Sequence, residues 1–153
     1  MNRITQTFES LAATNRKALV GYLTAGDPNP ETSFAILRKA CDSGIDILEL
    51  GVPFSDPTAD GPAIQEASQR ALAAGMSLSK TLALAARLRQ EVETPIMLFG
   101  YDNPLFKYGL ARLAKEASEA GVDGLLVVDL PPEEAGPLRA ALEGTDIQII
   151  LLV

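Results

Sequence analysis

Five short apolar runs alternate along the chain with longer segments in which apolar residues recur at helical spacing. The runs predict strands at residues 18–23, 46–50, 95–99, 124–128 and 147–153. The longer segments predict helices at residues 31–42, 62–74, 78–91, 110–120 and 133–142, and an amphipathic helix containing Ile4, Phe8 and Leu11 precedes the first strand. Because strands and helices alternate without a tight-hairpin signal, the pattern predicts an α/β fold with a parallel sheet.

Two parallel architectures fit this pattern. A flavodoxin-like doubly wound sheet has five strands in a chain of about this length, whereas a closed (β/α)8 barrel usually takes about 250 residues, so length favours the open sheet. Two observations favour the barrel. Residues 41–50 and 118–127 read as copies of one helix–glycine–strand unit, and the sequence stops in the apolar run QIILLV with no helix after it. That ending is interpreted as a truncation, so residues 1–153 are expected to form one partial domain.

Composition is ordinary for a globular domain, with 47% hydrophobic and 22% charged residues. The net charge of −7 makes nucleic acid and anionic membranes poor candidate partners. The first residues lack the apolar core of a secretion signal, and no stretch approaches the ~20 apolar residues of a membrane span. The expected location is therefore the cytoplasm.

The chain has one cysteine and no histidine, which restricts its possible chemistry. Disulfides, cysteine-rich zinc sites, imidazole bases and Ser-His-Asp triads are excluded, and carboxylates, lysine, tyrosine and bound cofactors remain. Cys41 falls on the apolar positions of a predicted helix and is expected in the core. No Walker loop or G-x-G-x-x-G motif supports nucleotide binding.

Candidate functional residues follow the predicted strands, because ligands of parallel α/β folds bind where strands end. Glu49 is the sharpest candidate: it alternates with two leucines, so it is expected to point away from the helices into an apolar barrel mouth, where a raised pKa suits a proton donor. Asp60 precedes Gly-Pro and a helix, so it fits an N-cap at least as well as a catalytic role. Asp27 and Asp56 are interpreted as turn residues, and Lys107 is the one lysine that could face the mouth.

Four strings in the sequence carry a family resemblance: LVGYLTAGDP, DILELGVPFSDPTADGPAIQ, YDNPLFKYG and AGVDGLLVVDLPPEE. They resemble successive signatures of the tryptophan synthase alpha subunit, from about residue 2 to the end. The resemblance implies a (β/α)8 TIM barrel, here with about five of its strands, and a lyase that cleaves indole-3-glycerol phosphate to indole and glyceraldehyde 3-phosphate. It assigns Glu49 as the acid that protonates the ring carbon, and Asp60 as the base that accepts the ring N–H proton.

The resemblance also implies a binding slot and a partner. Tyr22, Phe99, Leu126 and Val128 match an apolar slot for indole, although plain barrel filling is nearly as good an explanation. The family works as an α₂β₂ complex with a beta subunit that carries pyridoxal phosphate, so no cofactor and no metal is expected in this chain. The surface that meets the beta subunit matches Pro53, Asp56, Pro57, Asn103 and Pro104.

Some features depart from the family pattern. Tyr22, Thr58, Asp102 and Val128 stand where other residues are expected in many members, and Asp102 adds a charge near the mouth. Members also continue through strands six to eight, where phosphate-binding loops of such barrels are usual. The expectation for the 153-residue chain is therefore negligible turnover. A non-catalytic half-barrel that self-associates through its open edges is the alternative.

Overall fold

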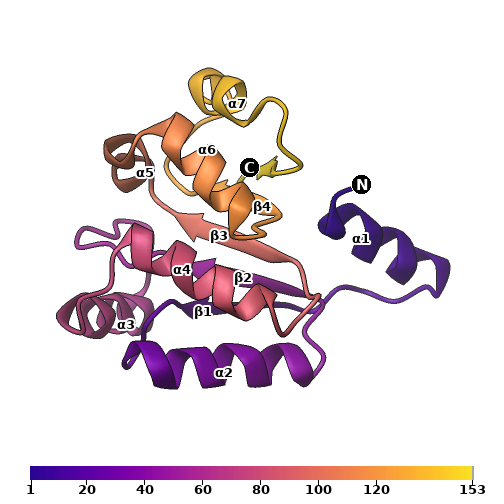
Figure 1. Ribbon diagram of the computed structural model, residues 1–153, viewed down its shortest axis with the longest axis horizontal. Coiled ribbons are helices and arrows are strands. Elements are labelled where there is room, and N and C mark those ends of the chain that lie inside the picture. The colour runs from indigo at the N-terminus through magenta and orange to yellow at the C-terminus, as the bar shows by residue number, and fades with distance from the viewer. Residues whose placement is uncertain (153) are drawn as a thin grey trace.

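The computed structural model describes residues 1–152. Its elements in chain order are α1 (Arg3–Ala13), β1 (Val20–Thr24), α2 (Pro30–Asp42), β2 (Ile47–Gly51), α3 (Pro62–Ala73), α4 (Leu78–Arg89), β3 (Ile96–Gly100), α5 (Asp102–Tyr108), α6 (Leu110–Glu119), β4 (Gly124–Val127), α7 (Gly136–Leu142) and β5 (Gln148–Ile150) (Figure 1). All neighbouring strands pair in parallel, as the alternating pattern predicts.

The strand order decides between the two architectures left open by the sequence. The sheet runs β1-β2-β3-β4-β5, so each strand lies beside the next one in the chain. A flavodoxin-like sheet would have the order 2-1-3-4-5. Sequential order with helices between successive strands is the arrangement of a (β/α)8 barrel, and the predicted barrel-type fold is confirmed for the five strands and the helices that connect them.

The hydrophobic core lies between one face of the sheet and the helices. Leu48, Leu50, Leu98 and Leu125 point to this side, each at most 2% exposed, and pack among the helices. Figure 1 shows α2, α4 and α6 following one another along the sheet. Cys41 also lies in this core, as predicted. The helices therefore occupy the outer face and leave the opposite face for the residues that alternate with these leucines.

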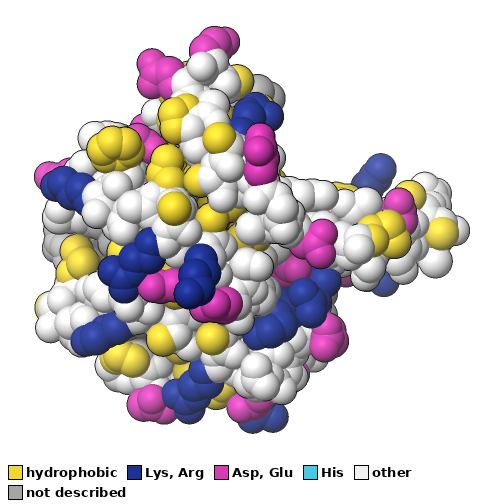
Figure 2. Space-filling view, turned by 45° about the horizontal axis from the view of Figure 1, so that its top comes forward, with side chains coloured by type: hydrophobic (Ala, Val, Ile, Leu, Met, Phe, Trp, Pro, Cys, Tyr) yellow, Lys and Arg dark blue, Asp and Glu magenta, His cyan; other side chains and the backbone are white. Residues whose placement is uncertain are grey.

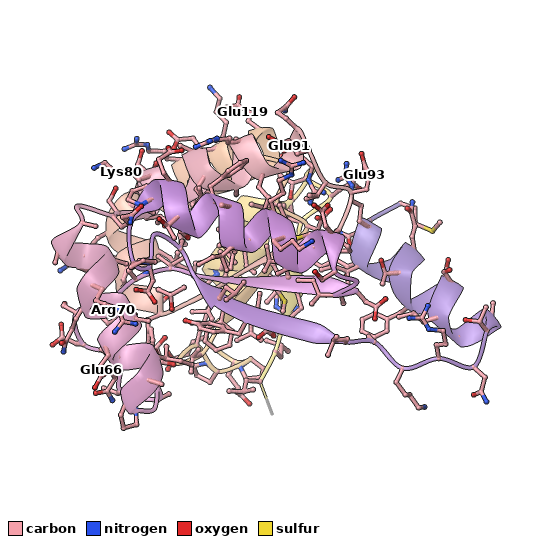
Figure 3. All side chains as sticks on the ribbon, turned by 90° about the horizontal axis from the view of Figure 1, so that it is seen from below. Glu66, Arg70, Lys80, Glu91, Glu93 and Glu119 are labelled. Atoms are coloured by element: carbon pink, nitrogen blue, oxygen red, sulfur yellow. The ribbon has the colours of Figure 1, made fainter. Side chains whose placement is uncertain are left out.

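Helix α1 lies at the amino-terminal ends of the strands. The Asn2 side chain donates to the backbone carbonyl oxygens of Asp123, directly before β4, and of Asp146, two residues before β5. Arg3 forms ion pairs with Glu93 and Asp123. Glu93 lies beside α1 in Figure 3, and the helix with its linker projects as an arm in Figure 2. Consequently α1 stands at the end of the sheet opposite the candidate site.

Glycines end two of the helices as the sequence predicts. Gly44 follows α2 with φ of 99°, and Gly121 follows α6 with φ of 73°. These left-handed conformations cost a residue with a Cβ atom but not glycine. The repeated helix–glycine–strand unit is thereby confirmed as a repeated backbone turn.

Several element boundaries differ from the prediction. Strands β1, β2 and β3 begin and end one or two residues later than the apolar runs, and β5 is shorter, with Val153 outside the described residues. Helix α7 begins at Gly136 rather than at residue 133, because Pro137 suits its first turn. Helix α5 was not predicted at all. It has seven residues, contains a proline and lacks a side-chain cap, so its sequence signal is weak.

Candidate active site

Glu49 lies in the middle of β2 on the face of the sheet opposite the helices. Its neighbours in the chain, Leu48 and Leu50, are fully buried on the helix side. Across the sheet Glu49 is in register with Tyr22 on β1 and Met97 on β3. Within residues 1–152 no side chain hydrogen-bonds or pairs with its carboxylate, and burial alone raises its pKa. The predicted inward orientation is therefore what the structure shows.

Tyr22 and Phe99 form an aromatic wall beside Glu49. Their rings meet edge to face, with centroids 5.2 Å apart and an interplanar angle of 79°. Gly51 makes room for this wall: a Cβ atom there would lie 2.6 Å from Tyr22 Cζ and would overlap the hydroxyl oxygen. Tyr22 is in register with Glu49, but its hydroxyl lies next to Gly51, two residues further along β2. The hydroxyl is therefore nearer the carboxyl end of the sheet than the Glu49 backbone.

Asp60 lies in the loop between β2 and α3 and does not cap the helix. The N-cap residue of α3 is Gly61, which makes no side-chain capping bond. Tyr101, just after β3, instead ties the loop in place: its hydroxyl oxygen accepts the Ala59 N–H at 3.0 Å and hydrogen-bonds to the Asp60 carboxylate. The Tyr101 ring also packs on Phe54, with centroids 5.4 Å apart. The structural-cap interpretation of Asp60 is therefore wrong.

Electrostatic effects connect the two acids. Burial raises the pKa of Asp60, and the hydrogen bond from Tyr101 opposes that rise. Burial also raises the pKa of Tyr22, which the charges of Asp60 and Glu49 raise further. Glu49 lies on β2, and the loop that carries Asp60 is held by Tyr101 just after β3, the next strand of the sheet.

The other predicted slot residues share this face. Phe99 is in register with Leu126 on β4 and with Gly51 on β2. Leu126 is buried and Val128 is half-buried just beyond the end of β4. Side chains at 126 and 128 point to the same side by strand alternation. The four residues therefore line one continuous wall that starts at Tyr22 and continues past β4.

Of the residues predicted to meet a partner, three lie in the loop after β2 and two lie in the first turn of α5, which follows β3. Asp56 and Asn103 are exposed, and Pro57 and Pro104 are partly exposed. Pro53 is buried and presents little surface. Pro104 lies in the first turn of α5, where a missing backbone N–H costs nothing.

Among the described residues, the remaining charged candidates form no hydrogen bond or ion pair with Glu49 or Asp60. Asp27 is bound by Arg70 of α3 through two hydrogen bonds of 2.7 and 3.0 Å (Arg70 is labelled in Figure 3). Burial raises the pKa of Asp102, and the charges of Asp129 and Glu134 raise it further. Glu49 and Asp60 do not contribute to this rise. Lys107 is an exposed residue of α5. Within residues 1–152 no group of three or more acidic or cysteine side chains is placed to hold a metal ion.

Tyr101 and Thr24 lie in strand-end segments that the sequence marks for inspection, but sequence reasoning assigned no role to either residue. Tyr101 is 3% exposed and holds the Asp60 loop, while the Thr24 hydroxyl lies 3.4 Å from that of Tyr22. The position of Tyr101 directly after a strand was the available signal.

A hollow of about 430 Å³ lies at the other end of the sheet, between α1 and the starts of β2 and β3. The site itself is an open face rather than an enclosed cavity.

Comparison with known proteins identifies the family. Residues 8–153 match the family model described as tryptophan synthase alpha chain. The chain is 58% identical over 153 residues to the tryptophan synthase alpha chain of Desulfosudis oleivorans, covering all of this chain and 58% of that protein. It is 54% identical to the one from Desulfatibacillum aliphaticivorans, again over 58% of that protein.

Solved structures agree with the sequence comparison. The crystal structure of the tryptophan synthase alpha chain from Legionella pneumophila matches with a TM-score of 0.93 and 44% identity, over 98% of this chain and 56% of that chain. A tryptophan synthase from M. tuberculosis, in its aminoacrylate- and BRD0059-bound form, matches with a TM-score of 0.95 and 38% identity, over 99% and 61%. The chain thus spans somewhat more than half the length of these relatives, and it belongs to the tryptophan synthase alpha chain family.

Proposed function

We propose that this chain supplies the acid–base pair of a tryptophan synthase alpha subunit, a lyase of tryptophan biosynthesis. The reaction is the retro-aldol cleavage of indole-3-glycerol phosphate to indole and glyceraldehyde 3-phosphate. One observation carries the proposal: Glu49 faces away from the helices beside an aromatic wall, and the loop with Asp60 is tied to Tyr101 at the carboxyl end of β3. That is the end where active sites of this fold lie.

The raised pKa of Glu49, caused by burial, suits the first step. Protonated Glu49 donates its proton to the ring carbon that bears the side chain, while the Asp60 carboxylate accepts the ring N–H proton. The product is an indolenine tautomer, whose C=N bond can accept an electron pair. A higher pKa also makes the Asp60 carboxylate a stronger base, and Tyr101 holds it in position.

Bond cleavage restores both groups. The Glu49 carboxylate takes the proton of the side-chain hydroxyl, the carbon–carbon bond breaks, and its electron pair returns to the ring. The ring nitrogen regains a proton from Asp60, so Glu49 ends protonated and Asp60 ionised, as they began. The step releases an aldehyde and indole without a metal, a Schiff base or a histidine, which fits a chain that contains no histidine.

The test uses a joined protein. In it, residues 1–153 of this chain are fused to the remaining part of the Desulfosudis oleivorans relative, which this chain does not match. The joined protein is expected to release indole from indole-3-glycerol phosphate, and Glu49→Gln or Asp60→Asn to lower kcat by about 10²- to 10⁴-fold. Glu66→Gln, on the exposed side of α3, is the control and should leave kcat unchanged. Turnover that survives Glu49→Gln would contradict the proposal.

The 153-residue chain alone is expected to show negligible turnover. Its five strands do not include the loops after strands seven and eight, where such barrels often bind phosphate. Near-normal cleavage by the chain alone would contradict this expectation. The same cleavage assay, run on both proteins, compares the turnover of the 153-residue chain with that of the joined protein.

The partner in this proposal is a beta subunit, in an α₂β₂ complex that works in the cytoplasm. Two exposed residues support a docking surface there: Asp56 in the loop after β2, and Asn103 in the first turn of α5, which follows β3. Pyridoxal phosphate belongs to the beta subunit, and this chain carries no cofactor. None of the helices within residues 1–152 is long and apolar enough to cross a membrane.

Asp56→Lys should weaken co-sedimentation with a beta subunit.

A second candidate function is a non-catalytic half-barrel that associates with itself. The observation that favours it is the open sheet: within the described residues, β1 and β5 each have a neighbouring strand on one side only. Unpaired strand edges are templates for pairing with another chain. The oligomeric state and the cleavage assay distinguish the two candidates.

A further inference from the structure

The Tyr22 hydroxyl is a polar group in the aromatic wall that the proposed mechanism does not use. Phenylalanine would provide the same ring surface, as Phe99 does beside it. The hydroxyl nevertheless lies over Gly51 at the open end of the sheet, in space that any side chain at position 51 would need. The backbone at Gly51 and the hydroxyl are therefore fitted to one another.

The ring around this hydroxyl has little freedom to move. Phe99 holds one side by an edge-to-face contact, and β1 is hydrogen-bonded to β2 along its whole length, from Val20 to Thr24. Tyrosine has only two side-chain torsions, so packing on its ring fixes the direction of its O–H group. A fixed polar group is what selective recognition of a ligand requires.

The hydroxyl also has hydrogen-bonding capacity to spare. Among residues 1–152 its neighbour is the Thr24 hydroxyl at 3.4 Å, well beyond the usual distance of about 2.8 Å for such a bond. Burial, and then the charges of Asp60 and Glu49, raise the pKa of Tyr22, so the group remains protonated at neutral pH. It is a neutral donor whose hydrogen-bond neighbour in the described residues, the Thr24 hydroxyl, is a poor acceptor at that distance.

We propose that the Tyr22 hydroxyl is a specificity-determining group that donates a hydrogen bond to a polar substituent on a bound aromatic ring. The site therefore favours a hydroxyl-substituted indole over a methyl-substituted indole of the same size. This inference rests on the proposed function, because it takes the region between the acids as the ring site. A methyl group would leave the donor unpaired, and one neutral hydrogen bond corresponds to about three- to tenfold in Kd.

The chain contains no tryptophan, which makes a direct binding test possible. Fluorescence of an indole ligand can be excited without a background from protein indole. We would titrate the intact chain into matched pairs, 5-hydroxyindole with 5-methylindole and 6-hydroxyindole with 6-methylindole. The expected result is about three- to tenfold tighter binding of the hydroxyl compound in at least one pair. Tyr22→Phe should abolish that preference.

Tyr108→Phe is the matched control, because it removes the same atom from a tyrosine that hydrogen-bonds to Glu116 on the helix side. It should leave the preference intact. Equal binding of both compounds by the unchanged chain would overturn the inference, as would a preference that survives Tyr22→Phe, or failure of every indole to bind.

A second measurement tests the geometry without a ligand. Tyrosinate absorbance follows the titration of all three tyrosines. The contribution of Tyr22 is the difference between the curve of the unchanged chain and the curve of Tyr22→Phe. Glu49→Gln and Asp60→Asn should each lower its titration midpoint; no change in either would overturn the inference. Cleavage by the joined protein is judged separately, so intact turnover without hydroxyl preference rejects this inference and leaves the proposed function standing.

Discussion

At the scale of single residues, Glu49 makes folding depend on pH. Its ionised form loses hydration when the chain folds and gains no partner in the described residues, so its folded-state pKa is raised. An acid with a raised folded-state pKa destabilises the folded protein once it ionises. The proposed catalytic role of Glu49 and the stability of the fold therefore oppose one another at this position.

Replacing Glu49 with glutamine should make that opposition measurable. Below the unfolded pKa of about 4.3 the acid is protonated in both states, so wild type and variant should respond alike to small pH changes. As pH rises through the raised folded pKa, wild type loses stability relative to Glu49→Gln, and the gap is constant above it. Urea unfolding of both proteins from pH 4 to 8 measures this. A gap that does not widen with pH would show that Glu49 is not desolvated.

Tyr101 is expected to act as a positioning residue for Asp60. Tyr101→Phe removes the acceptor of the Ala59 N–H and the partner of the Asp60 carboxylate. Turnover of the joined protein should fall about tenfold, since misplacement of a catalytic group is costly. Because the lost hydrogen bond had lowered the pKa of Asp60, the acidic limb of the kcat/KM profile should shift to higher pH. A purely structural role would lower stability without moving that limb.

At the scale of elements, Asp123 connects α1, α4 and β3. It is 4% exposed and accepts hydrogen bonds from Arg89 at 2.8 Å and from the Ile96 N–H at 2.9 Å, and it pairs with Arg3 at 3.2 Å. Arg89 is itself largely buried. This cluster anchors the amino-terminal ends of β3 and β4, opposite the candidate site.

Asp123→Asn should lower the free energy of unfolding by about 3 kcal/mol, because it leaves a buried guanidinium without its counter-charge. Glu93→Gln is the control, since the Glu93 side chain is 88% exposed and its pair with Arg3 should contribute less than about 1 kcal/mol. Urea denaturation measures both. Equal effects would mean that burial of the pair does not govern its contribution.

Elements could be predicted where the signal is local. The alternation around Glu49 follows from Leu48 and Leu50 alone, so its orientation was accessible from the sequence. The role of Tyr101 was not accessible from the sequence. It depends on a hydrogen bond from the Ala59 N–H, 42 residues away, which joins the segments after β2 and β3. Helix α5 and the start of α7 were missed where prolines gave ambiguous local signals. For Asp60 the local pattern fitted a helix cap at least as well, and the resemblance alone favoured a catalytic role.

At the scale of the whole molecule, the edges of the sheet predict association of the 153-residue chain. Val20 on β1 is 42% exposed and the adjacent Leu19 is 60% exposed. Sedimentation velocity should show a concentration-dependent rise in mass, and Val20→Lys should reduce it by placing a charge on the edge. Ile36→Lys is a matched control, because Ile36 is also 42% exposed but lies on α2. A monomer at all concentrations would argue against edge pairing.

The fit between Gly51 and the Tyr22 ring restricts the order in which these two positions can change. A larger residue at 51 overlaps the ring while tyrosine is present, whereas a smaller residue at 22 can be accepted first because it merely vacates space. Descendants of this sequence should therefore lose the ring at 22 before they gain a side chain at 51. Laboratory evolution started from either single mutant should show the same asymmetry.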